Sequence, residues 1–348
     1  MGVESQEVAA TCENSSVMRR AVLLYNPQSG GAHARRETII DRTLQALRAL
    51  GVDASKEATR GAREAGEQAK RLAGDGFDTI IACGGDGTIH DVLQGMVGTP
   101  AALGVIPLGT ANSLAQDLGL SRDSTKAAAQ LVEASLRRVA VGQIEFQFGA
   151  ERQRRHFTVA CGIGIDAALF YKMNARFKQR FGMAAYVAQS LRMWALETFH
   201  PFVAEWFDTD LRQKRSEIVT QVLVVRIANF GGVLNRLAPG ADLLRDDFRL
   251  VLFKTANKAR YLRFATGRLI NRDWQDRHIE LVHASEITCT PHRGDNGGAP
   301  VIHAEADGEL LGRLPVSITA IPNALNLLVP KAASCLQNLP TVMELSRR

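Results

Sequence analysis

Short apolar runs alternate with amphipathic stretches over the first third of the chain. Each run ends at glycine, proline or asparagine, which predicts a buried strand followed by a loop. Between the runs, apolar residues recur at helical spacing, as at Ile40, Leu44 and Leu47. Strands that alternate with helices predict a parallel sheet with helices on both faces, a Rossmann-like three-layer α/β domain. The predicted strands cover 21–25, 52–59, 79–83 and 103–107.

The pattern changes after about residue 140, where alternation typical of strands dominates. A helix-rich interruption is expected from Asp166 to about Phe199. We expect a mainly antiparallel second domain, either a β-sandwich or an open barrel. The predicted strands are 139–148, 157–163, 203–207, 219–228, 248–253, 279–290 and 301–305, with further strand-like alternation over 316–329.

These patterns divide the 348 residues into two domains and two tails. We expect a disordered tail over 1–18, an α/β domain over 19–142, a β-rich domain over 143–315 and a second tail over 331–348. The strand expected at 316–330 is a candidate for return to the first domain. The sequence contains no apolar run of about 18 residues and no secretory signal pattern, so neither a membrane span nor export is predicted.

Composition and charge add the expected compartment and exclude one class of partner. The five cysteines are scattered and form no CxxC pair, which is typical of a reducing, cytoplasmic compartment. The net charge is +6, but the basic residues occur in short groups without interleaved aromatic residues. We therefore expect no nucleic-acid partner.

A glycine-rich turn directly follows the strand at 79–83. The segment Gly84-Gly85-Asp86-Gly87-Thr88 offers backbone N–H donors and the start of a helix, the features that bind phosphate groups. It matches neither the Walker A pattern nor GxGxxG. A carboxylate at Asp86 would repel phosphates unless it binds Mg²⁺ or accepts a proton, which indicates phosphoryl transfer. The alternative is a tight turn whose aspartate caps the helix.

Further segments have related patterns. Asn-Pro-Gln-Ser-Gly-Gly at 26–31 and Pro-Leu-Gly-Thr-Ala-Asn at 107–112 also follow strands, so they share the edge where such sheets bind ligands. Gly-Ile-Gly-Ile-Asp-Ala at 162–167 and Ala-Asp-Gly-Glu at 306–309 come later, and Ile-Pro-Asn-Ala-Leu closes the series at 321–325. Together the blocks resemble the domain shared by diacylglycerol kinases, sphingosine kinases and the bacterial lipid kinases related to them. The resemblance extends from about Arg19 to Pro330.

This resemblance implies an ATP- and Mg²⁺-dependent lipid kinase. Residues 19–142 would bind ATP and residues 143–315 the lipid, with diacylglycerol as the default acceptor; sphingoid bases, ceramide and phosphatidylglycerol stay open. The implied nucleotide-binding residues are Asn26, Thr59, Gly84, Gly85, Asp86, Gly87, Thr88, Ile89, His90, Asp91, Gly109, Thr110 and Asn112.

The resemblance also implies which carboxylates act. Glu309 matches the catalytic carboxylate of the family, with Asp307 close by, while Asp86 would serve the phosphates. Either Glu309 or Asp86 must accept the proton of the lipid hydroxyl, and we expect Glu309 to do so. Taken alone, Asp307-Gly308 is equally a hairpin turn.

Three positions depart from the family pattern. Asp91 replaces a glutamate, Ser113 an aspartate, and Phe248 a glycine of the family's metal-binding loop. If that loop still binds a second Mg²⁺, Asp247 would be its side-chain ligand, assisted by the Leu244 and Arg249 carbonyl groups. A lipid-binding pseudokinase is compatible with these departures, and NAD kinases share the Gly-Gly-Asp-Gly turn.

The sequence indicates less clearly which residues would contact the lipid acceptor and the membrane. The stretch from Tyr171 to Phe202 mixes basic residues with apolar ones, which suits either an anionic membrane surface or a core helix with cations at its rim. We expect a cytoplasmic protein that associates peripherally with an anionic membrane, where its lipid substrate is presented. A homodimer is left open.

Overall fold

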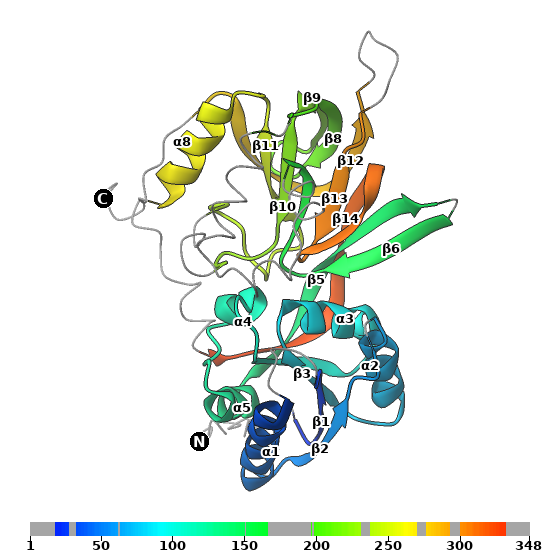
Figure 1. The fold of residues 1–348 in the computed structure, drawn as a ribbon, viewed down its shortest axis with the longest axis vertical. Helices are drawn as coiled ribbons and strands as arrows, with labels where there is room; N and C mark the ends of the chain where they lie inside the picture. Colours follow the sequence, from blue (N-terminus) through cyan, green and yellow to red (C-terminus); the bar gives the residue numbers. More distant parts are fainter. Residues whose placement is uncertain are drawn as a thin grey trace, which may run out of the picture.

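The structure, a computed structural model, describes residues 18–27, 33–61, 63–149, 151–165, 196, 198–230, 237–269, 276–292 and 300–331. Figure 1 shows two domains, a lower one with helices around a sheet and an upper one dominated by strands. The predicted fold class, a Rossmann-like α/β domain followed by a mainly antiparallel β domain, is confirmed.

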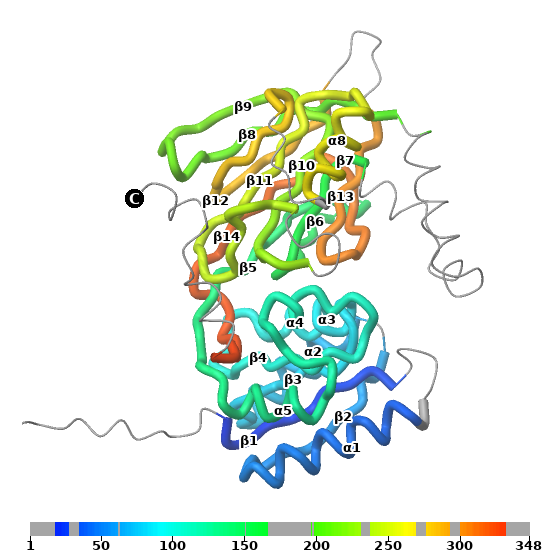
Figure 2. The backbone as a smooth tube through the Cα atoms, turned by 90° about the vertical axis from the view of Figure 1, so that its left-hand side faces the viewer, coloured from blue at the N-terminus to red at the C-terminus, as the bar shows by residue number. Residues whose placement is uncertain are grey.

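The N-terminal domain contains a parallel sheet with the strand order β2-β1-β3-β4. Its strands β3 and β4 are buried along their whole length, because helices cover both faces. Figure 2 shows α1 and α5 below this sheet, and α2, α3 and α4 between the sheet and the upper domain. The elements are β1 (Arg20–Tyr25), α1 (His33–Ala49), β2 (Asp53–Ala58), α2 (Ala65–Gly74), β3 (Thr79–Gly84), α3 (Asp86–Met96), β4 (Ala102–Pro107), α4 (Ser113–Asp117) and α5 (Ser124–Val132).

Two long strands connect the domains. β5 (Ser135–Phe148) leads out of the first domain, and β14 (Glu309–Val329) runs antiparallel beside it. Near its end β14 also pairs with β4 in parallel, where Asn326 lies opposite Ala102 and Leu327 opposite Leu103. The strand at the end of the C-terminal domain therefore extends the sheet of the first, and the described strands form one continuous network (Figure 1).

The C-terminal domain is built around a closed ring of antiparallel strands, β14-β13-β7-β10-β11-β12, in which β12 pairs again with β14. Apolar side chains fill the ring, and Phe157 stacks on Phe248 with ring centroids 5.8 Å apart. The further strands are β6 (Glu151–Phe157), β7 (Ala160–Gly164), β8 (Phe202–Asp208), β9 (Gln213–Val219), β10 (Gln221–Val225), β11 (Phe248–Phe253), β12 (Ile279–Pro291) and β13 (His303–Ala306).

A helix that the sequence pattern did not predict, α8 (Lys258–Leu269), lies against the ring from outside. Tyr261 and Phe264 point inward and contact Phe253, with ring centroids 4.3 and 5.3 Å away. Basic residues interrupt this narrow apolar face, which hides the helical period in the sequence. The helix expected from Asp166 to about Phe199 lies almost entirely outside the described residues. None of the helices that the structure describes is long and apolar enough to cross a lipid bilayer.

Candidate active site

Two glycine-containing loops meet at the carboxyl ends of β3 and β4. β3 ends at Gly84 and α3 begins at Asp86, while β4 ends at Pro107, opposite Gly84. The loops approach so closely that a Cβ atom on Gly109 would lie 2.5 Å from the Cα atom of Gly85. Real side chains do not tolerate that distance, so glycine is required for the contact itself.

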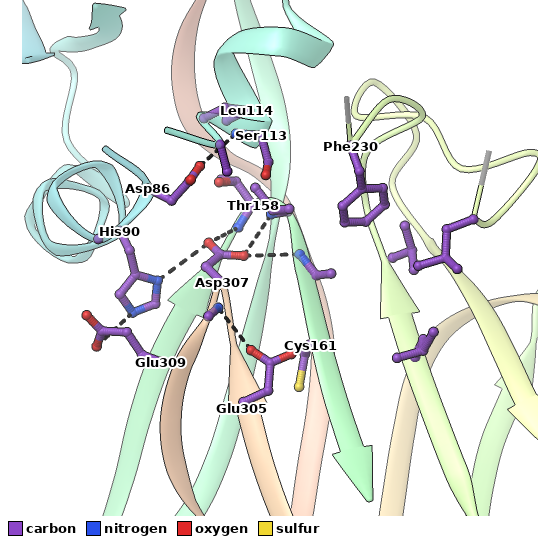
Figure 3. A pocket seen from close by; sticks show the side chains of 18 of the residues that line it. Asp86, His90, Ser113, Leu114, Thr158, Cys161, Phe230, Glu305, Asp307 and Glu309 are labelled. Carbon is purple, nitrogen blue, oxygen red and sulfur yellow. Dashed lines mark hydrogen bonds and ion pairs between the residues drawn. The ribbon is translucent and has the colours of Figure 1, made fainter. Parts of the chain in front are cut away.

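Asp86 links the same two loops through its side chain. Its oxygens accept hydrogen bonds from the backbone N–H groups of Asn112, at 2.9 Å, and Ser113, at 2.7 Å. Figure 3 shows the bond to Ser113. Asn112 adopts a left-handed backbone conformation with φ of 54°, and its amide group exchanges two hydrogen bonds with Gly109. Asp86 thus caps the following helix, α4, rather than its own helix, which shows a structural role that the sequence did not indicate.

The other residues implied for the nucleotide lie around this centre. Asn26 and Thr59 follow the neighbouring strands β1 and β2, where the Thr59 N–H donates to the Tyr25 carbonyl oxygen at 2.8 Å. Neither lines the cavity described below. Residues 28–32 of the first loop lie outside the described residues. Among the implied residues, those that line the cavity are Asp86, Gly87, Ile89, His90 and Thr110.

A second carboxylate centre comes from the hairpin turn between β13 and β14. Asp307 and Gly308 both have positive φ, 49° and 84°, so the turn alternative is correct for the backbone. The Asp307 side chain, only 4% exposed, nevertheless reaches into the site. Its oxygens accept three backbone N–H groups at 3.0 Å, from Thr158, Val159 and Ala160.

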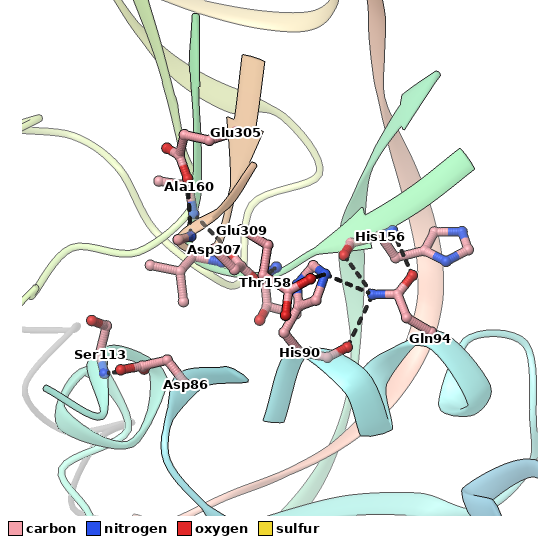
Figure 4. Close-up of polar contacts among 12 residues, drawn as sticks. Asp86, His90, Gln94, Ser113, His156, Thr158, Ala160, Glu305, Asp307 and Glu309 are labelled. Atoms are coloured by element: carbon pink, nitrogen blue, oxygen red, sulfur yellow. Dashed lines mark hydrogen bonds and ion pairs between the residues drawn. The ribbon is translucent and has the colours of Figure 1, made fainter. Parts of the chain in front are cut away.

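Glu309 follows this turn and faces the cavity (Figures 3 and 4). Its side chain is 30% exposed, and one oxygen lies 3.9 Å from Nε2 of His90. A third acidic side chain of the hairpin, Glu305, precedes the turn on β13. It accepts the Gly308 N–H at 2.9 Å and also lines the cavity. The structure therefore brings the predicted carboxylates Asp86, Asp307 and Glu309 to one site. Of the three, only Glu309 accepts no hydrogen bond from a backbone N–H group of the described residues, and its side chain is partly exposed.

His90 lies between the two carboxylates of the hairpin. Its Nδ1 atom is 3.5 Å from Asp307, and the ring is 1% exposed. Burial lowers the pKa of His90, but the contact with Asp307 and the charges of Asp307, Glu309 and Asp91 outweigh burial, so the pKa is raised. The ring lies 3.5 Å from Asp307 and 3.9 Å from Glu309, so it joins helix α3 to the hairpin.

Gln94, one turn further along α3, fixes the position of His90. Its amide nitrogen donates to the carbonyl oxygens of His90, at 3.0 Å, and His156, at 2.9 Å, while its oxygen accepts the His156 N–H (Figure 4). The same amide nitrogen lies 3.5 Å from Nε2 of His90, the ring atom that also lies 3.9 Å from Glu309. No role was predicted for Gln94; its i+4 spacing from His90 is the signal that could have indicated one.

These groups form one end of a cavity of about 960 Å³. The cavity passes beside Thr158 and Cys161 (Figure 3) and continues along the outer face of β10 and β11 to α8. Sequence reasoning missed its apolar wall, because alternation along a strand does not show which face meets a ligand. The wall consists of Leu223, Val225, Phe230, Leu237, Phe253, Tyr261, Leu262, Phe264 and Ala265.

The residues expected to hold a second Mg²⁺ are engaged otherwise. Both Asp247 oxygens accept hydrogen bonds from Arg245, at 2.6 and 2.7 Å, and one also accepts the Thr209 hydroxyl group at 2.9 Å. Burial raises the pKa of Asp247, but these hydrogen bonds hold it far below its usual range. Phe248, which replaces the family glycine, is fully buried.

A buried arginine lies beneath the same loop. Arg226 is 0% exposed and donates to the carbonyl oxygens of Leu243, Arg245, Asp247 and Ala140 at 2.6 to 2.8 Å. A Mg²⁺ ion at this loop would lie near two guanidinium groups, so the donor set does not fit it. The described residues also contain no cluster of three or more potential metal-ligating side chains.

Comparisons with known proteins agree with this arrangement. Residues 20–144 match the diacylglycerol kinase catalytic domain family, and residues 159–329 match the YegS C-terminal NAD kinase beta sandwich-like domain family. A diacylglycerol kinase of Bacillus subtilis (strain 168) is 31% identical over 317 residues, which cover 90% of this chain and 97% of that protein. A diacylglycerol kinase of Mycobacterium tuberculosis (strain ATCC 25618 / H37Rv) is 27% identical over 316 residues, covering 90% and 96%.

The fold agrees as well. A crystal structure of a diacylglycerol kinase from Bacillus anthracis str. Sterne has a TM-score of 0.65 at 18% identity, covering 90% of this chain and 98% of that one. The two family matches follow one another along the chain and correspond to its two domains. This chain therefore belongs to the diacylglycerol kinase family of enzymes.

Proposed function

We propose that this enzyme transfers the γ-phosphoryl group of ATP to the hydroxyl group of a lipid, with diacylglycerol as the first candidate acceptor. The observation that carries the proposal is the single cavity that joins the glycine loops to an apolar wall. Phosphates would bind at its polar end and acyl chains along its apolar end. The reacting hydroxyl group would then lie between them, beside Glu309.

The polar end suits the phosphate chain of a nucleotide. The N-terminus of α3 points its free N–H groups there, and nothing lies within 4 Å of the position that a Cβ atom on Gly87 would take. Each oxygen of Asp86 accepts one N–H and keeps lone pairs, so Asp86 could also bind the Mg²⁺ that accompanies ATP. When bound, Mg²⁺ neutralises charge that develops on the phosphates.

Glu309 is the best placed general base. Asp307 accepts three backbone N–H groups and Asp86 two, whereas Glu309 is partly exposed and faces the cavity. The lipid hydroxyl would give its proton to Glu309 while its oxygen attacks the γ-phosphorus atom. The bond from that phosphorus to the bridging oxygen would break, and ADP would leave with the electron pair. His90 would orient Glu309 from behind.

The departures from the family pattern have local explanations that support activity. Asp91 accepts the Arg63 N–H at 3.2 Å, a contact close to the helix rather than in the cavity. Ser113 contributes its backbone N–H to Asp86, which any residue at that position could do. Asp91 does not line the cavity, whereas Ser113 places a hydroxyl group there instead of the family's carboxylate. Because Asp86, Asp307 and Glu309 all still line the cavity, a pseudokinase is the weaker alternative.

An NAD kinase would need an acceptor site for a polar dinucleotide. The far end of this cavity instead presents leucine, valine and aromatic side chains, which favours acyl chains. The net charge of +6 favours peripheral binding to an anionic membrane, where such an acceptor resides. Lipid is therefore the preferred acceptor class.

A direct assay tests this proposal. The protein is incubated with labelled ATP, Mg²⁺ and, separately, diacylglycerol, a sphingoid base, ceramide, phosphatidylglycerol or NAD. We expect label in a lipid, no label without Mg²⁺, and a loss of about 10²–10⁴-fold in kcat for Glu309→Gln. Label only in NAD, or label in none of the acceptors, would reject the lipid-kinase proposal.

A further inference from the structure

Exposed residues line the cavity at both its polar and its apolar end. At its polar end, Thr110 and Ala111 are exposed and line the cavity. At its apolar end, Leu262 and Ala265 of α8 do the same, and Leu262 is 52% exposed. An acyl chain that enters from the apolar end therefore passes α8. Figure 1 shows this helix on the outside of the C-terminal domain.

All the charged residues of α8 are basic. The helix contains no acidic residue, and its basic residues are Lys258, Arg260, Arg263 and Arg268. Aromatic rings hold two of them in place, because Lys258 lies over Phe199 at 5.5 Å and Arg268 over Phe264 at 4.9 Å. Arg260 is paired with Asp276. Arg263 is exposed and directly follows Leu262 in the sequence.

An exposed leucine among basic residues is the arrangement by which helices lie on anionic bilayers. Here the exposed leucine itself lines the apolar end of the cavity. A long-chain lipid that crossed water to reach this end would expose every methylene group of its chains. Contact between α8 and the bilayer removes that exposure, because the chains can then pass directly from the membrane into the cavity.

We propose that α8 is the membrane-docking surface of this enzyme, with Leu262 in the interfacial layer of an anionic bilayer and Arg263 beside lipid phosphate groups. This inference rests on the proposed lipid-kinase function. It places docking on α8, whereas the stretch from Tyr171 to Phe202, which the sequence suggested for this role, lies almost entirely outside the described residues.

Binding to vesicles tests the surface without any need for catalysis. The purified full-length protein is sedimented with vesicles of phosphatidylglycerol and phosphatidylcholine, or of phosphatidylcholine alone. Arg263→Glu and Leu262→Gln should each weaken binding to the anionic vesicles by about tenfold. Matched controls on the β8–β9 hairpin, Lys214→Glu and Leu211→Gln, should bind like the wild type; Leu211 is 58% exposed and neither residue lines the cavity.

A second measurement separates docking from chemistry. Arg263 does not line the cavity, so Arg263→Glu should phosphorylate a dispersed short-chain diacylglycerol at the wild-type rate. On long-chain diacylglycerol in anionic vesicles the same variant should lose about tenfold in kcat/KM. Equal losses on both substrates, or equal sedimentation of the α8 variants and their controls, would overturn the proposal. A wild type that sediments through α8 but phosphorylates no lipid would refute the proposed function alone.

Discussion

The Nδ1 atom of His90 lies 3.5 Å from Oδ2 of Asp307, although 217 positions separate the two residues in the sequence. His90 belongs to the helix that follows the glycine loop, and Asp307 to the hairpin turn that presents Glu309. Because Asp307 is itself held by three backbone N–H groups, the pair joins the two domains at the centre of the active site (Figure 4).

Replacing His90 with asparagine should lower stability in a pH-dependent way. The pKa of His90 is raised in the folded state, so its cationic form contributes stability below its ordinary value of 6.5. That contribution disappears as pH rises through the higher folded-state pKa. Unfolding of wild type and His90→Asn should differ by about 1–2 kcal/mol near pH 5.5 and progressively less above neutral pH. A difference that stays constant up to about pH 9 would contradict the ion pair.

The two carboxylates of the hairpin should respond differently to loss of charge. Glu309→Gln should lower kcat by about 10²–10⁴-fold with little change in melting temperature, because no backbone N–H group of the described residues donates to its side chain. Asp307→Asn should lower melting temperature as well, since an amide accepts the three N–H groups more weakly than a carboxylate. Kinetics and thermal unfolding of both variants check this; equal effects on stability would refute the division of roles.

Two alanine substitutions separate the contact between the loops from the binding of phosphate. Gly109→Ala would place a Cβ atom 2.5 Å from Gly85, so it should disturb the loops even without nucleotide and lower melting temperature. Gly87 has open space around it, so Gly87→Ala should change the free energy of unfolding by no more than about 1 kcal/mol. Titration with ATP should show weaker binding for both. Wild-type affinity in Gly87→Ala would mean that phosphates do not approach this backbone.

Asp117 should make the protein less stable as pH rises from about 4 to about 6. Burial raises its pKa from 3.8 to about 6, despite hydrogen bonds from the Asn229 and Ala228 N–H groups at 2.8 and 3.0 Å. The folded state therefore binds an extra proton between these two values. Asp117→Asn, which can still accept from the backbone, should raise the melting temperature at pH 7 by a few degrees. An unchanged pH dependence in this variant would show that another group is responsible.

Arg226 should stabilise the loop at 243–247 without any metal. Arg226→Met leaves four main-chain carbonyl groups without this donor and should cost about 3–5 kcal/mol of stability. In the absence of ATP, neither EDTA nor Mg²⁺ should shift the melting temperature of the wild type. A clear stabilisation by Mg²⁺ alone that Asp247→Asn abolishes would indicate a metal at this loop after all.

Local sequence patterns predicted the elements of the first domain more completely than those of the second. The strands ending at Tyr25, Gly84 and Pro107 and the helix after Asp86 follow from continuous apolar runs and glycine turns, which are short-range signals. The hairpin at Asp307 was equally visible as a turn. In contrast, α8 was missed, because only Tyr261 and Phe264 mark its buried face among several basic residues.

By itself the sequence determined the family, the alternation of strands and helices, and the residue types placed at the carboxyl ends of the strands. Only the tertiary structure decided what those residues contact: Asp86 bridges two loops, and Arg226 binds main-chain carbonyl groups of the loop expected to hold a metal. The reason is that backbone turns depend on neighbours in sequence, whereas a carboxylate or guanidinium group takes its partner from whatever the fold brings within about 3 Å.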